Sequence, residues 1–179
     1  MGSRDEDRFA RLVREHSPAV GNYLRRRLYP LTSSDLDDLV EETMIVVWRR
    51  LDRVPHDAEL PWMLGVARNV LRNARRSKNR RSAFESTLHP PRNESSAEDA
   101  VIADTSVRDA MIALDDDDRE IVLLNAWDGL DTHALGVYFS ISTNAAAVRL
   151  SRAQSRFREL LGSSEVPRKY EPADDSNDV

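Results

Sequence analysis

An apolar periodicity near 3.6 residues runs through most of this chain, and it constrains the fold more than any other feature. The period is lost once, over residues 82–104, where Pro90-Pro91 and clustered polar residues are typical of a loop or linker. No useful stretch of β-type alternation and no internal repeat accompanies it. The sequence therefore predicts an all-α protein of two small helical domains, residues 7–81 and 105–162, joined by a flexible linker.

Three helices are expected in the first domain. The spacing predicts one over residues 7–28, which Pro30 ends. Thr32–Ser34 offer N-caps for a second helix, and Pro61 suits the first turn of a third. The apolar stripe of the second helix comprises Leu36, Leu39, Val40, Met44, Val47, Trp48 and Leu51. The buried side of the third comprises Met63, Val66, Val70 and Ala74.

Helical patterning resumes at Val107 and is expected to end at Gly129. A short helix over residues 131–139 and a last helix to Leu161, with Gly162 as its C-cap, complete the second domain. The last helix has Leu150, Ala153, Phe157 and Leu160 along one face. Residues 163–179 are rich in acids and proline and are expected to form a disordered acidic tail.

Composition excludes several classes of protein. The chain has no cysteine, which rules out disulfides, thiolate metal sites and a cysteine nucleophile. No apolar run approaches the roughly 18 residues that a bilayer span needs, so we expect no membrane insertion and a cytoplasmic protein.

The net charge of −5 conceals a block pattern. Residues 68–81 and 149–158 contain bases and no acid, whereas residues 35–42 contain acids and no base. Residues 85–118 are also strongly acidic. A chain that binds DNA at two places has this pattern, although solvated helix faces produce it as well.

The segment from Gly129 to Leu150 has the form of a helix-turn-helix. Its turn contains a small Ser140, an apolar Ile141 expected to plug between the helices, and Ser142 as N-cap. An αα-hairpin inside a helical bundle is the alternative interpretation. The residues expected to meet duplex DNA are Ser142, Thr143, Asn144, Ala147, Arg149 and Arg152.

The helix after Pro61 combines guanidinium and amide side chains in a pattern that fits unpaired bases and backbone phosphates. Spacings of three and four put Arg68, Arg72 and Arg75 on one face. Asn69, Asn73 and Arg76 lie beside them.

The acids of residues 35–42 are expected to serve structure or interaction. No His-x-x-x-His or Glu-x-x-His spacing accompanies them, and the four histidines are scattered. Acids in a first helical turn also favour the helix dipole. No catalytic residue, metal ligand or cofactor is therefore predicted, and a carboxylate–metal hydrolase is the least favoured of the classes considered.

Together these pieces resemble a bacterial RNA polymerase sigma factor of the extracytoplasmic-function group. Residues 37–49, beginning Asp-Asp-Leu-Val-Glu-Glu-Thr-Met, look like the family's polymerase-binding motif. Residues 61–69, with Ala-Arg-Asn at their end, look like the start of its −10 element helix. Residues 118–121 and the helix-turn-helix look like its −35 element domain.

The resemblance implies a promoter-specificity subunit that binds core RNA polymerase through the β′ clamp helices and the β flap. The polymerase contacts that it implies are Asp38, Leu39, Glu41 and Glu42. The basic helix would read the −10 element as single-stranded DNA, and the last helix would read the −35 element as duplex. The acidic linker would pass near the polymerase active cleft. An anti-sigma protein is a further partner, and the sigma factor itself would perform no chemistry.

The −35 half departs from the family pattern. Ala134 stands where the family typically has Glu, and Ala147 lies where it often has Lys. Either the −35 sequence is unusual, or this domain binds weakly and depends on the polymerase. A DNA-binding regulator that never engages polymerase is the alternative function, and co-purification with core polymerase distinguishes the two.

Overall fold

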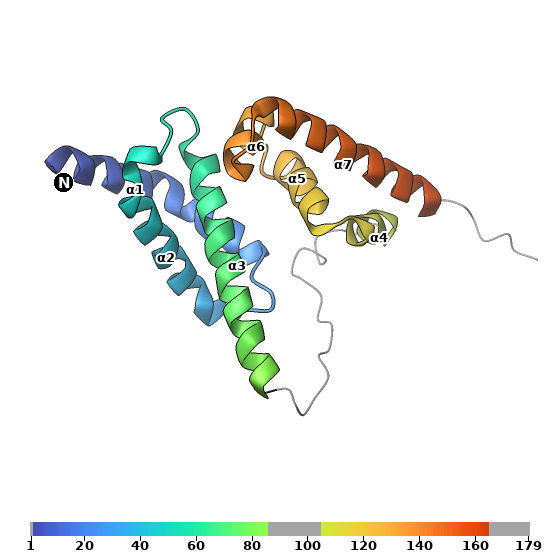
Figure 1. The fold of residues 1–179 in the computed structure, drawn as a ribbon, viewed down its shortest axis with the longest axis horizontal. Helices are drawn as coiled ribbons and strands as arrows, with labels where there is room; N and C mark the ends of the chain where they lie inside the picture. The colour runs from blue at the N-terminus through green and yellow to red at the C-terminus, as the bar shows by residue number, and fades with distance from the viewer. Residues whose placement is uncertain (1, 86–104, 165–179) are drawn as a thin grey trace, which may run out of the picture.

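The computed structural model describes residues 2–85 and 105–164, and every element within these ranges is helical (Figure 1). This confirms the predicted all-α class. The elements are α1 (Ser3–Arg26), the 3-10 turn η1 (Ser33–Asp35), α2 (Leu36–Arg49), the 3-10 turn η2 (Leu51–Arg53), α3 (Glu59–Glu85), α4 (Thr105–Ala113), α5 (Asp116–Ala126), α6 (Thr132–Phe139) and α7 (Thr143–Ser164). No helix in this part of the chain is both long and apolar enough to cross a membrane.

The first three helices follow the predicted order with shifted ends. α1 begins before the expected residue 7, and α3 begins at Glu59, so that Pro61 lies in its first turn as predicted. α3 continues past residue 81 to Glu85. Loss of apolar periodicity does not end a helix by itself, and neither Gly nor Pro interrupts residues 82–85.

The second half differs from the expected pattern between residues 107 and 129. Two helices, α4 and α5, replace a continuous one, because Asp115 caps α5 by accepting a hydrogen bond from the Asp118 amide at 2.8 Å. Trp127 lies just beyond α5 and is 44% exposed. Gly129 has a φ of +67° and turns the chain, as expected from its position. Gly162 lies inside α7, so the predicted C-cap there is wrong.

One hydrophobic core extends through both halves of the molecule. α3 lies between α1 and α2 on one side and α6 on the other (Figure 1). Leu12 and Leu24 of α1 belong to the same cluster as Ile121 of α5 and Leu135 of α6. A smaller cluster of Met111, Leu114 and Leu123 joins α4 to α5, with Phe157 and Leu160 of α7 packed against it. The two predicted helical units are thus packed together in this structure.

The two halves approach each other closely at Gly65 of α3. A Cβ atom there would lie 2.7 Å from the backbone oxygen of Tyr138 in α6. Any side chain larger than hydrogen would push α6 away, so glycine permits the backbones of the two helices to approach each other closely. Gly65 lies within the motif of residues 61–69, which did not predict this packing role.

The predicted flexible linker and acidic tail fall mainly outside the described residues. Of the linker, only residues 82–85 are described, as the end of α3. Of the tail, residues 163–164 are described, as the end of α7.

Candidate nucleic-acid interface

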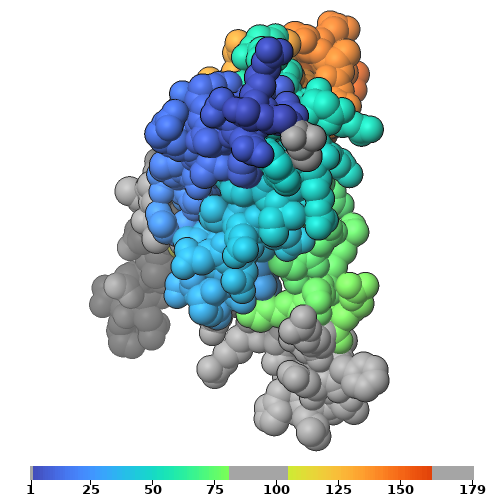
Figure 2. All heavy atoms as spheres, turned by 90° about the vertical axis from the view of Figure 1, so that its left-hand side faces the viewer, coloured from blue at the N-terminus to red at the C-terminus, as the bar shows by residue number. Residues whose placement is uncertain are grey.

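The carboxylates of α2 lie on an open face of the first half. Asp38, Glu41 and Glu42 are exposed, and Figure 2 looks onto the side of the molecule that α1 and α2 form. Leu39 is different, since it is only 3% exposed and belongs to the core. The expectation of Leu39 as a surface contact therefore needs correction, because its side chain supports α2 from behind.

An apolar groove adjoins these carboxylates. Phe9 of α1 and Met44, Ile45 and Trp48 of α2 line a cavity of about 330 Å³, with Glu6 and Glu41 at its edge. The Phe9 and Trp48 rings lie 5.0 Å apart, and Ile45 is 41% exposed. α2 thus presents apolar and acidic groups side by side.

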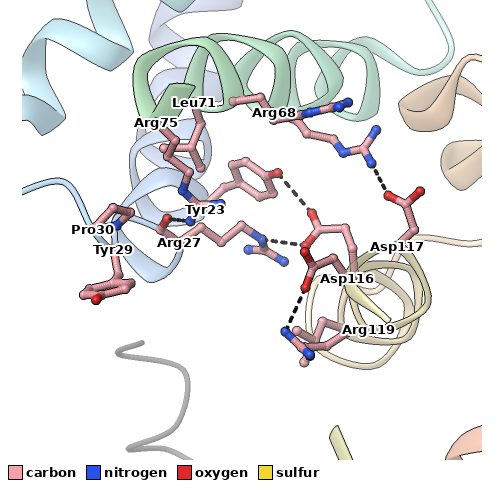
Figure 3. Close-up of a pocket in the computed structure, with 13 residues that line it drawn as sticks. Tyr23, Arg27, Tyr29, Pro30, Arg68, Leu71, Arg75, Asp116, Asp117 and Arg119 are labelled. Atoms are coloured by element: carbon pink, nitrogen blue, oxygen red, sulfur yellow. Dashed lines mark hydrogen bonds and ion pairs between the residues drawn. The ribbon is translucent and has the colours of Figure 1, made fainter. Parts of the chain in front are cut away.

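The arginines of α3 line a cavity between α1, α3 and α5 (Figure 3). Its volume is about 610 Å³, and Arg68, Arg72 and Arg75 all contribute to its wall, as their shared helix face predicts. Arg75 donates a hydrogen bond to the backbone oxygen of Arg27. Arg72 is exposed.

The remaining residues of the basic helix lie on its outer side. Asn69, Asn73 and Arg76 are exposed. Asn73 lines a different hollow from the arginine triplet, together with Lys78 and Arg80. The basic helix therefore offers two surfaces rather than the single continuous one that the sequence indicated.

α6 and α7 form a helix-turn-helix with capped ends. Asp131 accepts a hydrogen bond from the Ala134 amide at 2.8 Å, and Ser142 accepts one from the Ala145 amide at 3.1 Å. Ser140 ends α6 in a left-handed conformation with φ of 56°. Gly136 allows the turn to close, because a Cβ there would lie 3.0 Å from the Ile141 oxygen. The predicted N-cap at Ser142 is confirmed.

The turn residue Ile141 is 37% exposed, so it does not plug the space between α6 and α7 as expected. Leu135 and Ala146, both 0% exposed, fill the interior instead.

The start of α7 presents most of the side chains predicted to meet duplex DNA. Ser142, Thr143, Asn144 and Arg152 are exposed, and Ala147 is half-buried. Arg149 lies over the Phe139 ring, 4.8 Å from its centroid.

A single carboxylate on α5 joins the two arginine-bearing helices. Asp117 Oδ1 accepts a hydrogen bond of 2.6 Å from Arg68 of α3, and its Oδ2 lies 2.9 Å from Nη2 of Arg149 in α7. Burial opposes ionisation of Asp117, but the hydrogen bond from Arg149 and the nearby arginine charges outweigh it and lower its pKa. Asp117 is therefore held as an anion between two cations.

A second polar contact lies deeper in the same interface. The hydroxyls of Tyr23 in α1 and Tyr138 in α6 are 2.6 Å apart, and both donate to Glu120 of α5. Arg27 donates to the other oxygen of Glu120 at 3.0 Å. Burial raises the pKa of both tyrosines, so they remain protonated donors.

One cluster of metal-ligand residue types occurs in residues 2–85 and 105–164. Glu15, His16 and Glu59 bring their ligand atoms within 4.8 Å of one another. Arg11 already occupies these carboxylates, with contacts of 2.6 Å to Glu59 and 2.9 Å to Glu15. The hydrogen bond from Arg11 also lowers the pKa of Glu59. The guanidinium of Arg11 supplies here the positive charge that a metal ion would supply.

The residues that join the halves were not predicted from the sequence. Asp117 stood in the acidic run 115–118, and Glu120 in a family-like motif, but nothing marked either as a partner of α1, α3 or α7. Ion pairs between residues 49 positions apart, such as Arg68 and Asp117, leave no periodic signal. Among these residues, only Gly65 offered a sequence signal, because a glycine inside a helix can mark a close helix–helix contact.

The comparisons with known proteins agree with this architecture. Residues 12–81 match the sigma-70 region 2 family. The chain is 31% identical to the RNA polymerase sigma factor CarQ of Myxococcus xanthus, over 90% of its own length and 93% of that protein's. It is 27% identical to the RNA polymerase sigma factor NccH of Alcaligenes xylosoxydans xylosoxydans, over 90% and 91% respectively.

Two solved structures share the fold. One is the sigma factor RpoE in complex with the anti-sigma factor NepR from Bartonella quintana, with a TM-score of 0.55, 20% identity, and coverage of 86% of this chain and 96% of that one. The other is CnrH in complex with the cytosolic domain of CnrY, with a TM-score of 0.53, 22% identity, and coverage of 87% and 88%.

A helical bundle with an acidic second helix, followed by a helix-turn-helix, defines a transcription-initiation protein of the sigma-70 type. The chain belongs to the RNA polymerase sigma factor family. The resemblance to its extracytoplasmic-function group is confirmed.

Proposed function

We propose that this chain is a promoter-specificity subunit that acts in the cytoplasm, binds core RNA polymerase and performs no chemistry itself. The observation that carries the proposal is the coexistence, in one chain, of an exposed acidic helix with two arginine-bearing helices. Residues 7–81 would bind polymerase and the −10 element, and residues 105–162 would bind the −35 element. Residues 82–104 would connect them, with residues 163–179 as a tail.

The acidic face of α2 is the docking surface for core polymerase in this proposal. Asp38, Glu41 and Glu42 project from one exposed helix, and the groove at Ile45 and Trp48 adds apolar area beside them. Such a surface suits a basic helical partner, for which the β′ clamp helices are the family's candidate. The second half would contact the β flap.

The two arginine-bearing helices are the proposed DNA surfaces. Arg68, Arg72 and Arg75 on α3 would follow the backbone of the melted −10 strand, and Asn69 would bond to its bases. The capped start of α7 would enter the major groove, where Asn144 and Arg149 are within reach of base edges. Ser142 and Thr143 would hold a phosphate at the helix N-terminus, with Arg152 on a neighbouring one.

An anti-sigma protein is a further proposed partner. Two structures of similar fold are sigma factors in complex with proteins of this kind, NepR and, for CnrH, the cytosolic domain of CnrY. This chain covers nearly the whole of both sigma factors, 96% and 88%, so it contains the corresponding helices.

Charge reversal on α2 tests the polymerase surface. We expect Asp38→Lys and Glu42→Lys each to weaken binding to purified core polymerase roughly tenfold, because a like charge would then face a basic partner. Fluorescence titration of labelled chain with core enzyme measures the affinity. Run-off transcription on a promoter library then measures promoter-directed initiation.

Asp52→Lys is the matched control, since Asp52 is exposed and lies outside α2, in η2. It reverses the same charge and should leave affinity for core polymerase unchanged. Circular dichroism checks that all three variants keep their helix content, because Asp38 also favours the dipole in the first turn of α2. Unchanged affinity in the α2 variants would contradict the docking surface.

A further inference from the structure

The arginine-lined cavity between α1, α3 and α5 has the size and charge of a site for a small anionic ligand (Figure 3). Its volume of about 610 Å³ lies within the range of roughly 300–1,000 Å³ that small-molecule sites occupy. Five arginines, three carboxylates and two tyrosines contribute to its wall. The excess of positive charge favours a ligand that carries several negative charges.

The carboxylates of the wall are already engaged by arginines of the same wall. The pairs are Glu120 with Arg27, Asp117 with Arg68, and Asp116 with Arg119. Arg72 of α3 is different, because it is exposed and its side chain makes no hydrogen bond or ion pair with any residue of the described ranges 2–85 and 105–164. Its planar guanidinium can therefore bind a phosphate group through two donors at once.

The arginines of α3 form a row along the cavity. Arg68, Arg72 and Arg75 follow one another at about one helical turn, so the row extends for about 10 Å at a rise of about 1.5 Å per residue. A single phosphate group is too small to contact the whole row. A chain of two or three linked phosphates is long enough to bridge neighbouring arginines.

An aromatic side chain lies at the other end of the cavity. Tyr29 follows α1, is 37% exposed and lines the wall next to Pro30. Figure 3 shows Tyr29 at the end opposite Arg68 and Asp117. A tyrosine ring at the mouth of a cationic cavity offers a face on which a nucleobase can stack, whichever base it is.

We propose that this cavity binds a nucleoside polyphosphate, with Arg72 and its neighbours on α3 holding the phosphates and Tyr29 stacking on the base. The same arginines are proposed above to follow the −10 strand, so the nucleotide competes with single-stranded DNA. This competition rests on the proposed function, whereas binding of the nucleotide does not.

Isothermal titration calorimetry of the full-length chain with ATP tests the site. Magnesium is omitted, because the metal neutralises part of the phosphate charge. We expect one site per chain with a dissociation constant between about 10 μM and 1 mM. Tripolyphosphate lacks the base and should bind at least about fivefold more weakly than ATP, and adenosine lacks the phosphates and should not bind measurably.

Two substitutions test the two ends of the site separately. Arg72→Gln should weaken the binding of ATP and of tripolyphosphate by at least about fivefold each, because a charge-assisted phosphate contact is lost. Tyr29→Leu should weaken ATP by a similar factor and leave tripolyphosphate unchanged. Tyr29→Phe keeps the ring and should retain the affinity for ATP.

Arg53→Gln is the matched control for Arg72→Gln. Arg53 is exposed in η2 and does not line this cavity, but its substitution removes the same charge from the chain. Circular dichroism checks that every variant keeps its helix content. Equal losses in Arg53→Gln and Arg72→Gln would overturn the site, since attraction would then follow net charge alone. Equal affinities of the wild-type chain for ATP and tripolyphosphate would overturn the role of Tyr29.

A competition experiment distinguishes failure of this site from failure of the proposed function. A fluorescent mixed-sequence single strand is bound to the chain, and ATP is added at constant ionic strength. We expect ATP to displace the strand from the wild-type chain, and Tyr29→Leu to require at least about fivefold more ATP. If the chain binds the strand and directs transcription but does not bind ATP, the nucleotide site alone is overturned. If it binds ATP but no strand, the proposed −10 surface fails and the nucleotide site stands. Simultaneous binding of both would overturn the competition.

Discussion

The acidic face of α2 and the arginine faces of α3 and α7 are engaged very differently in the same structure. Asp38, Glu41 and Glu42 stand on an open face, whereas Arg68 and Arg149 are bound to Asp117 and have side chains only 20% and 30% exposed. The first surface needs no rearrangement before it meets a partner. In the second, an acidic side chain of the protein already binds the arginines.

This contrast indicates that one chain can present its binding surfaces to different partners one after the other. A basic partner of α2 meets its carboxylates directly, while DNA must compete with an internal anion for the arginines. The Asp117 contacts affect this competition only if the packing that holds them contributes measurably to the free energy of folding. Substitutions in the packing between the halves measure that contribution.

Gly65→Ala should have the largest effect, because the new Cβ atom would lie 2.7 Å from the backbone of Tyr138. Backbone cannot rotate away as a flexible side chain does, so α3 and α6 must separate. We expect the free energy of unfolding to fall by about 1–3 kcal/mol, as is typical of overpacking. Urea denaturation followed by circular dichroism measures the change.

Gly21→Ala is the control for this variant. Gly21 also lies inside a helix, α1, but its nearest neighbour for a Cβ atom is the Val40 side chain at 3.9 Å, an ordinary contact. Alanine should therefore stabilise α1 by about 0.5–1 kcal/mol through helix propensity. If Gly65→Ala stabilised the protein similarly, the tight contact between the halves would be absent in solution.

The hydroxyl pair of Tyr23 and Tyr138 should give an effect of intermediate size. Each Tyr→Phe variant removes one donor to Glu120 and should cost about 1 kcal/mol of unfolding free energy. The double variant should differ from the sum by about 0.5–2 kcal/mol, because the two hydroxyls share one acceptor and contact each other at 2.6 Å. Additive losses would indicate that the two halves do not share this contact in solution.

The helices themselves were largely predictable from the sequence. Periodicity and caps located α1, α2, α6 and α7 within a few residues, since these signals are local. The division between α4 and α5 was not recognised, because the pattern of apolar residues continues across the break. The cap at Asp115 that causes it was hidden in a run of four consecutive aspartates.

The candidate site was predictable only in its parts. Helical spacing grouped Arg68, Arg72 and Arg75 on one face, and the structure places all three along one cavity. Helical spacing also placed Leu39 on the apolar stripe of the second helix, where the structure buries it, whereas the family motif implied that it contacts polymerase. That Asp117 lies against Arg68 depends on tertiary packing of α5 on α3, which no local pattern encodes.

Arg149→Ala should have the smallest effect on stability, below about 1 kcal/mol, because the ion pair with Asp117 is partly exposed.

Its effect on transcription is more informative, since Arg149 has two opposed roles. Its ion pair with Asp117 competes with DNA, whereas its proposed base contact favours DNA binding, and the substitution removes both. In an Asp117→Asn background the first role is already lost, so Arg149→Ala there isolates the contact with DNA. We expect run-off transcription in that background to fall on some −35 sequences more than on others. An equal loss on every promoter would assign Arg149 to a phosphate instead, and no loss at all would leave the ion pair with Asp117 as its sole role.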